Sequence, residues 1–175
     1  GRFVDKDRIE VVDAEGRVVE EIRAERFLIA TGSRPRNPPQ VPFDDTTILD
    51  SNRILKIDYL PESMLVLGGG IIGCEYGTMF AALGTRVVLI DKADRPLPRL
   101  DKGIGRRFGE YIEEMGVELK MKQVVKDIRR TPAGQVEVET ESGETFKAQC
   151  LFYALGRQAN VENLQLERAG IELDA

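Results

Sequence analysis

Histidine is absent from this sequence of 175 residues, and cysteine occurs only twice. Acid–base catalysis by an imidazole would therefore need residues from outside the chain. Cys74 and Cys150 lie far apart and form no CxxC or CxxxxC pair, so the sequence predicts neither a redox disulfide nor a zinc site. We expect both cysteines to be buried packing residues, and we expect the chain to contribute no metal ligand and no catalytic residue.

Strong positive charge and long apolar runs are also missing. The net charge is −5, and no cluster of Lys and Arg is present that would neutralise phosphates, so we expect no nucleic-acid partner. No apolar run approaches the roughly 20 residues of a membrane span, and no signal peptide is visible. With 42% apolar and 31% charged residues, the composition is that of an ordinary globular protein. We expect a cytoplasmic protein with no membrane partner.

The middle of the chain alternates apolar runs with helical periodicity. The predicted elements are a strand at 64–67, a helix at 71–83 closed by Gly84, a strand at 86–90, a helix from Asp101 to Gly116, and a strand at 117–119. Glycine after a helix suits a left-handed C-cap, and Asp101 suits an N-cap. This order predicts an α/β fold with a Rossmann-like parallel sheet.

The flanking segments follow a different pattern. Alternating β-branched residues and Gly or Asp turns predict strands at 9–12, 18–22 and 27–30, and later an antiparallel β-meander crossover at 124–128, 136–140 and 150–154. The meander adds a layer, so the predicted fold has three layers. Residues 33–48 contain four prolines, which favours a linker or domain crossing.

The two ends of the chain resemble each other. Residues 9–35 and 136–159 both read as a hairpin, an apolar strand, a small-x-Gly step and a loop. The second copy follows a glycine-rich run at 68–73, whereas no such run precedes the first copy. The chain also begins with Gly rather than Met. We infer that a first dinucleotide domain has been cut away; the alternative is two unrelated hairpins.

The strongest functional signal is the run Gly68-Gly69-Gly70-Ile71-Ile72-Gly73, between an apolar strand and a helix. Gly68 permits a tight turn, Gly70 lets the backbone approach a pyrophosphate, and Gly73 lets the helix pack closely on the strand. The N–H groups and dipole of the helix start would then face the phosphates. This arrangement predicts binding of a nicotinamide dinucleotide, NAD or NADP.

The residues around this run bear on coenzyme choice. Asp91, at the tip of the second strand, can accept hydrogen bonds from both ribose hydroxyls, which favours NAD. Lys92 and Arg95 could attract a 2′-phosphate or could be solvated loop charges, and Arg99 is a weaker candidate. Glu75 could make a polar contact near the nicotinamide or the flavin, or could be a carboxylate favoured by the helix dipole in the first turn. Ile71 could lie against the nicotinamide ring, and Gly156 ends a strand near the edge where the cofactor lies. Val125 could pack against the adenine side or belong to the core.

The segments FLIATGSRP, GGGIIGCEYGTMFAALGTRV and FYALGRQANVENLQLERAGIEL resemble those of the pyridine nucleotide–disulfide oxidoreductase superfamily. Within it, the chain most resembles soluble pyridine nucleotide transhydrogenases, with dihydrolipoyl dehydrogenases as near neighbours. The resemblance implies a homodimeric flavoenzyme with an FAD domain, an NAD(P) domain and a C-terminal interface domain. Glutathione reductase-like members carry Tyr where this chain has Ile71, which makes that branch a poorer match.

The resemblance also implies roles for particular residues. Thr31, Gly32 and Ser33 would match the segment beside FAD, and the nicotinamide-cofactor positions would be Gly68, Gly70, Gly73, Glu75, Asp91, Val125 and Gly156. The implied organisation is a tail of a truncated FAD domain at 1–45, an NAD(P)-binding domain at 46–157 and a return segment at 158–175. The implied reaction is hydride exchange between NADPH and NAD through FAD, and the fragment alone is expected to be inactive. A dihydrolipoyl dehydrogenase and a non-enzymatic nucleotide-sensing module are the alternatives.

Overall fold

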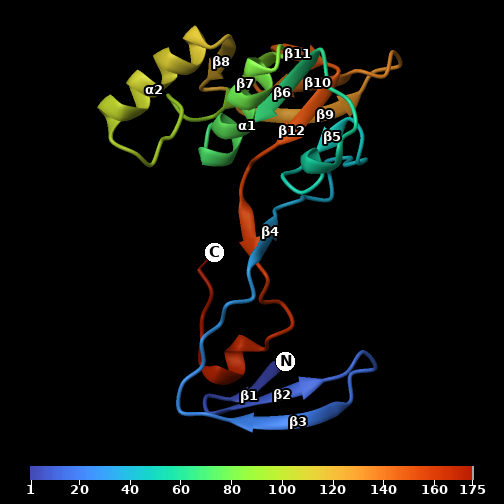
Figure 1. Cartoon of the computed structure of the whole chain (residues 1–175), viewed down its shortest axis with the longest axis vertical. Helices are drawn as coiled ribbons and strands as arrows, with labels where there is room; N and C mark the ends of the chain where they lie inside the picture. Colours follow the sequence, from blue (N-terminus) through green and yellow to red (C-terminus); the bar gives the residue numbers. More distant parts are fainter. Residues whose placement is uncertain (175) are drawn as a thin grey trace. The chain divides into compact units, whose positions relative to one another are not determined.

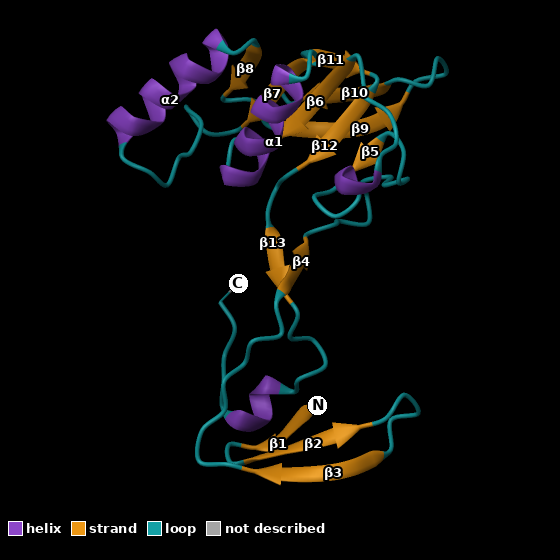
Figure 2. Ribbon diagram, in the orientation of Figure 1, coloured by secondary structure: helices purple, strands orange, loops and turns teal. Residues whose placement is uncertain are grey.

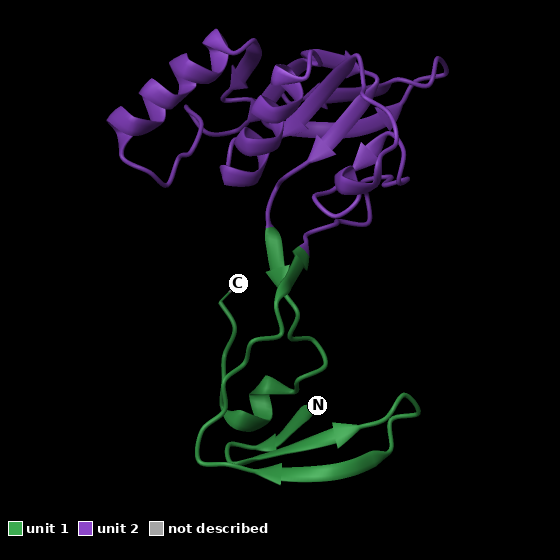
Figure 3. Cartoon of the chain, viewed as in Figure 1, with its two compact units in different colours: residues 1–34, 157–175 green, residues 35–156 purple. Residues whose placement is uncertain are grey.

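The computed structural model describes residues 1–174, which form two compact units (Figure 3). Unit 1 consists of residues 1–34 and the described residues from 157 onward, and unit 2 consists of residues 35–156. Because the chain passes out of unit 1 and returns to it, unit 2 is an insertion between the two segments of unit 1.

Unit 2 is built on a parallel sheet of five strands (Figure 1). The order across the sheet is β5 (Ile48–Leu49), β12 (Cys150–Tyr153), β6 (Ser63–Leu67), β7 (Arg86–Asp91) and β8 (Val117–Met121). Every residue of β6 is buried, as expected for a central strand covered on both faces. Its apolar run therefore belongs to the inside of a layered fold.

Each face of this sheet is covered by a different layer. On one face, Met64 and Val66 pack in a core cluster with residues of α1 (Ile71–Ala82) and α2 (Lys102–Glu114). On the other face, Leu65 and Leu67 pack in a second cluster with residues of an antiparallel sheet, which consists of β9 (Val125–Arg130), β10 (Val136–Thr140) and β11 (Thr145–Ala148). The alternation of side chains along β6 thus separates the two cores, and the predicted three-layer α/β fold is confirmed.

The predicted helix signals are found where the sequence placed them. The side chain of Asp101 caps α2 by accepting hydrogen bonds from Gly103 N at 2.8 Å and Ile104 N at 3.2 Å. The helices are followed by Gly84 and Gly116, whose φ angles of 96° and 92° lie in the left-handed region that favours glycine. Neither α-helix of the described residues is long and apolar enough to cross a membrane.

Both cysteines are buried, free thiols, as predicted. Cys74 lies on α1 and Cys150 begins β12, and the two side chains belong to the same apolar cluster on the helical face of the sheet. Burial raises the pKa of each thiol to about 11, so both are neutral near pH 7.

Unit 1 contains a three-stranded antiparallel sheet in the order β1 (Arg2–Asp5), β2 (Arg8–Val12) and β3 (Val18–Arg23). Leu166, on the short helix η2 (Leu166–Ala169), is buried in this unit. The backbone N–H of Phe3 donates to Leu164 O at 2.7 Å, which ties the returning segment to β1.

The predicted strand at 27–30 is wrong: the segment is a loop (Figure 2), and Leu28 is 93% exposed. An apolar run becomes a strand only where a sheet accepts its backbone groups and side chains, and no strand of the described residues pairs with it. The predicted linker at 33–48 instead contains β4 (Ser33–Pro35), which pairs with β13 (Arg157–Ala159), and the start of β5; the 3-10 helix η1 (Ile54–Lys56) follows β5. Strands β1, β11 and β13 were not predicted.

The capping of α2 can be tested by mutation. Asp101→Ala removes the acceptor for two N–H groups and should lower the free energy of unfolding by about 1 kcal/mol. Urea unfolding of the chain measures this loss. The control is Asp101→Asn, which keeps a good capping group and should retain most of the stability. Equal stability of the Asp101→Ala and wild-type proteins would contradict the capping role.

Candidate dinucleotide-binding site

The carboxyl ends of the parallel strands meet at one edge of the sheet in unit 2 (Figure 1). The glycine-rich segment follows β6, and Asp91 ends β7. Gly68 N donates to Ile90 O at 2.9 Å, and Ala154 N donates to Leu67 O at 2.8 Å. Ligands of open α/β sheets bind outside this edge, so these segments define the candidate site.

Two of the glycines are required by the fold itself. Gly68 has a φ of 110°, and a Cβ built on it would lie 2.7 Å from Ala154 O. A Cβ on Gly73 would lie only 1.8 Å from Gly68 O. Gly68 therefore excludes a side chain because the segment after β12 lies against it, and Gly73 excludes one because the start of α1 lies directly against the end of β6.

Gly70 is different, because a Cβ built on it would meet nothing within 4 Å. Its φ of −76° is also accessible to any residue. The packing of the described residues thus gives no reason for glycine at this position. A ligand whose phosphates approach the backbone here would supply one.

The start of α1 leaves its hydrogen-bond donors available. Gly70 is the N-cap and provides no side-chain cap, and the first backbone hydrogen bond of the helix runs from Cys74 N to Gly70 O at 3.0 Å. In the described part of the chain, the N–H groups of residues 70–73 have no partner. Together with the helix dipole, they form an environment suited to a diphosphate.

The glycine-rich loop is held in place through Gly69. Its N–H donates to Asp91 Oδ2 at 2.5 Å, and its carbonyl accepts from Leu97 N at 2.7 Å and from Cys74 Sγ at 3.4 Å. Because Cys74 is a neutral thiol, it can donate this hydrogen bond. The peptide groups that flank Gly70 are therefore fixed before any ligand arrives.

Asp91 has a structural role as well as its candidate role at the ribose. Besides Gly69 N, its carboxylate accepts from Ala93 N at 2.7 Å, and its side chain is half-buried. A carboxylate has about four lone-pair sites, so capacity remains for ribose hydroxyls. The two N–H groups already orient it at the end of β7.

Lys92 and Arg95 differ in their availability. Lys92 is exposed, and no described residue forms an ion pair with it. Arg95 is only 14% exposed; it pairs with Asp94 and donates to Pro98 O and Leu100 O at 3.0 and 3.3 Å. A Cβ on Gly105 of α2 would lie 3.0 Å from Arg95 Nε, so the guanidinium group packs against the helix and holds its own loop.

The other sequence candidates of unit 2 occupy varied positions. Glu75 is the fifth residue of α1 and is exposed, so it lies beyond the first turn, contrary to our expectation. Ile71, which begins the helix, is 72% exposed. Val125 begins β9 and packs against the second core cluster. Gly156 is exposed with a φ of 109°, and its carbonyl accepts from Arg36 N at 3.1 Å.

Thr31, Gly32 and Ser33 belong to unit 1, whereas the other candidate residues belong to unit 2. Their polar groups contact the returning segment of that unit: Asn160 donates to Thr31 O at 3.1 Å and to Gly32 O at 3.0 Å, and Arg157 donates to Ser33 Oγ at 2.9 Å. Unit 1 thus holds this segment in a defined loop.

Sequence reasoning missed Leu97, whose φ of 50° is unusual for a residue other than glycine. Its N–H fixes Gly69, and its side chain packs on the core beneath the helices. No local sequence signal predicts a left-handed leucine, because both contacts come from residues distant in the chain.

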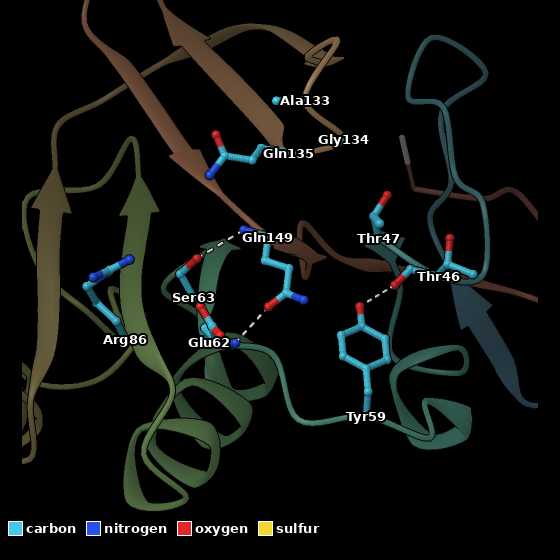
Figure 4. Close-up of a pocket in the computed structure, with 10 residues that line it drawn as sticks. All are labelled: Thr46, Thr47, Tyr59, Glu62, Ser63, Arg86, Ala133, Gly134, Gln135 and Gln149. Atoms are coloured by element: carbon cyan, nitrogen blue, oxygen red, sulfur yellow. Dashed lines mark hydrogen bonds between the residues drawn. The ribbon is translucent and has the colours of Figure 1, made fainter.

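A polar cavity of about 540 Å³ lies at the opposite edge of the sheet (Figure 4). Ser63 and Arg86, which line it, are the first residues of β6 and β7. Gln149 N donates to Ser63 Oγ at 3.0 Å, Glu62 N donates to Gln149 Oε1 at 2.8 Å, and Tyr59 donates to Thr46 O. Because the cavity lies at the amino ends of these strands, it is separate from the glycine-rich site at their carboxyl ends.

Known proteins resemble the chain over nearly its whole length. It is 36% identical to the soluble pyridine nucleotide transhydrogenase of Erwinia tasmaniensis over 173 residues, which is 99% of this chain and 37% of that protein. It is 41% identical to the dihydrolipoyl dehydrogenase of Bacillus subtilis over 159 residues, which is 90% of this chain and 35% of that protein. The chain thus spans well under half the length of these relatives.

Solved structures give the same result. LpdA from Mycobacterium tuberculosis superposes with a TM-score of 0.83 at 32% identity, over 96% of this chain and 36% of that one. The Cu(II) complex of the HOCl-induced flavoprotein disulfide reductase RclA from Escherichia coli gives a TM-score of 0.79 at 32% identity. The superposition covers 99% of this chain and 38% of that one. The family described as pyridine nucleotide-disulphide oxidoreductase matches residues 2–175. On the fold, the glycine-rich turn and this match, the chain belongs to the pyridine nucleotide-disulphide oxidoreductase family.

Proposed function

We propose that unit 2 binds NAD(H) or NADP(H) at the carboxyl edge of its parallel sheet. The observation that carries this proposal is the open space at Gly70, where a Cβ would meet nothing within 4 Å, beside the unpartnered N–H groups at the start of α1. The residues proposed to hold the dinucleotide are Gly68, Gly69, Gly70, Ile71, Ile72, Gly73, Glu75, Asp91, Lys92, Val125 and Gly156. Arg95 is proposed to support the loop.

We further propose that the whole protein is a cytoplasmic, homodimeric flavoenzyme of the soluble pyridine nucleotide transhydrogenase type, which moves hydride between NADPH and NAD through FAD. The identity to such a transhydrogenase over 173 residues supports this proposal. The nicotinamide and the flavin supply the hydride chemistry when bound. In this proposal, unit 2 binds and orients the dinucleotide, and Thr31, Gly32 and Ser33 of unit 1 lie beside FAD.

A dihydrolipoyl dehydrogenase is the second candidate, because the relative from Bacillus subtilis is 41% identical over 159 residues. A redox disulfide for that activity would come from residues outside this chain, since Cys74 and Cys150 are both free thiols. An assay of the whole protein distinguishes the two candidates. Transfer from NADPH to an NAD analogue, without oxidation of dihydrolipoamide, would support the transhydrogenase. We propose that the 175-residue chain alone does not turn over.

Gly70→Val tests the dinucleotide site. The added side chain should occupy the space proposed for the diphosphate and lower NADH affinity at least about tenfold, a loss of roughly 1.4 kcal/mol. The thermal midpoint without nucleotide should change little, because the side chain enters open space. Calorimetric titration with NADH measures the affinity.

The matched control is Gly77→Ala on the same helix, where a Cβ would make ordinary contacts at 3.7 Å or more. This variant should bind NADH like the wild-type chain. Undiminished NADH affinity in Gly70→Val would remove the site assignment.

Asp91→Ser tests recognition of the ribose. Loss of the carboxylate should weaken NADH binding relative to NADPH, shifting the ratio of the two affinities by about tenfold, since hydrogen bonds to charged groups contribute about 1.5–3 kcal/mol. Both affinities should also fall, because Gly69 loses its acceptor. Asp58→Ser, which alters an exposed carboxylate that precedes β6, serves as the control. An unchanged ratio in Asp91→Ser would show that Asp91 does not contact the ribose.

A further inference from the structure

Lys122, directly after β8, lies beside the candidate ribose site. Asp91 and Met121 are register partners at the ends of the adjacent parallel strands β7 and β8. Lys92 and Lys122 are therefore the first residues after two neighbouring strand ends. The N–H of Lys122 donates to Ala93 O at 2.8 Å, and Gln123 N donates to Asp91 O at 2.9 Å. The backbone of Lys122 is therefore held against the segment that follows Asp91.

The conformation of Lys122 is costly for a residue with a side chain. Its φ of 60° lies in the left-handed region, where glycine or asparagine is favoured. Strained residues of this kind cluster at functional sites, and here the surrounding hydrogen bonds maintain the strain. Glycine would satisfy the backbone better, so the lysine side chain itself needs an explanation.

The charge of Lys122 is not used within the described protein. The side chain is exposed, and no carboxylate of residues 1–174 forms an ion pair with it. By contrast, Lys120, two residues earlier on the same strand, pairs with Glu118 at 2.8 Å. Lys92 is likewise exposed and unpaired, whereas Arg95 is occupied by its own loop.

We propose that Lys92 and Lys122 form a lysine pair that recognises the 2′-phosphate of NADP(H), with Lys122 as a specificity-determining residue. This inference rests on the proposed dinucleotide site. A 2′-phosphate adds a dianionic group where Asp91 would otherwise accept hydrogen bonds from the ribose. Two flexible ammonium groups, one on the residue after Asp91 and one on the residue after its register partner Met121, offset the repulsion between that carboxylate and the phosphate.

The bonding of Asp91 makes both coenzymes compatible with one site. Gly69 N and Ala93 N already donate to its carboxylate, so part of its negative charge is compensated within the protein. The positive charge of the lysine pair, which no described carboxylate neutralises, is then available to the ligand. The site would accept NADH through Asp91 and NADPH through the two lysines.

Paired titrations of the chain with NADH and NADPH test this proposal. In Lys122→Gln, NADPH affinity should fall by about three- to fivefold, as expected for an exposed ion pair, while NADH affinity should stay within about twofold of wild type. Lys122→Arg keeps the charge and should retain NADPH affinity. Lys120→Gln makes the same change in net charge two residues away and should leave both affinities unchanged.

Two further measurements separate charge recognition from a structural effect. Binding of 2′,5′-ADP should weaken in Lys122→Gln while binding of 5′-ADP does not, which isolates the 2′-phosphate. The loss of NADPH affinity with added salt should be less steep in this variant than in wild type, because one ion pair fewer is screened. Thermal unfolding without ligand should be unchanged, since the backbone conformation is the same.

The outcomes that overturn the proposal are distinct. Equal weakening of NADH and NADPH in Lys122→Gln would mean that Lys122 acts only through the loop structure. Unchanged NADPH affinity, or a wild-type chain that binds NADH but not NADPH, would remove the lysine pair and leave the dinucleotide site intact. A wild-type chain that binds neither coenzyme would overturn both the site and the lysine pair.

Discussion

The close approach of α1 to the end of β6 is the constraint on which the site depends. With 1.8 Å between a Cβ on Gly73 and Gly68 O, no other residue could occupy this position without moving the helix. The contact aims the N-terminus of α1 at the carboxyl edge of the sheet, and the peptide groups of Gly69 and Gly70 follow from it. Gly70, the N-cap of the helix that this contact positions, lies where the fold leaves open space.

A second constraint is a small set of hydrogen bonds around Asp91, which joins the ends of β7 and β8 to the glycine-rich loop and to the loop after β7. Asp91 links the end of β7 to the glycine-rich loop through Gly69 and to its own turn through Ala93, while its carbonyl accepts from Gln123 after β8. Leu97 closes the arrangement by donating to Gly69 O. Preorganised donors cost less to use in binding than donors that must be ordered by the ligand. The left-handed conformations of Leu97 and Lys122 are maintained by this same set of bonds.

The sequence predicted the parts of unit 2 whose causes are local. The apolar run of β6, the glycines and the Asp101 cap each act within a few residues, so the strand, the helices and the glycine-rich turn could be derived in advance. The failures have distant causes. The strand at 27–30 needed a neighbouring strand that the described residues do not provide. Arg95 is a different case: it looked like a free cation because the fold of its own loop, which brings the Pro98 and Leu100 carbonyls to it, has no sequence signal. The position of Lys122 beside Asp91 depends on the register of β7 and β8, which the sequence does not reveal.

Arg95 differs from Lys92 and Lys122 in that its charged group is bound within the protein, whereas the two ammonium groups form no ion pair with a described residue. A guanidinium group offers a rigid fork that suits several fixed acceptors at once, and Arg95 uses it to hold the loop from Asp94 to Leu100. An ammonium group on a flexible stem acts more as a point charge and tolerates several ligand geometries. Because the rigid cation is engaged and the flexible ones are free, the charges left at this edge suit a phosphate without demanding one. In the proposed site, coenzyme choice would depend on a small difference between the hydrogen bonds of the Asp91 carboxylate and the attraction of two flexible lysine side chains.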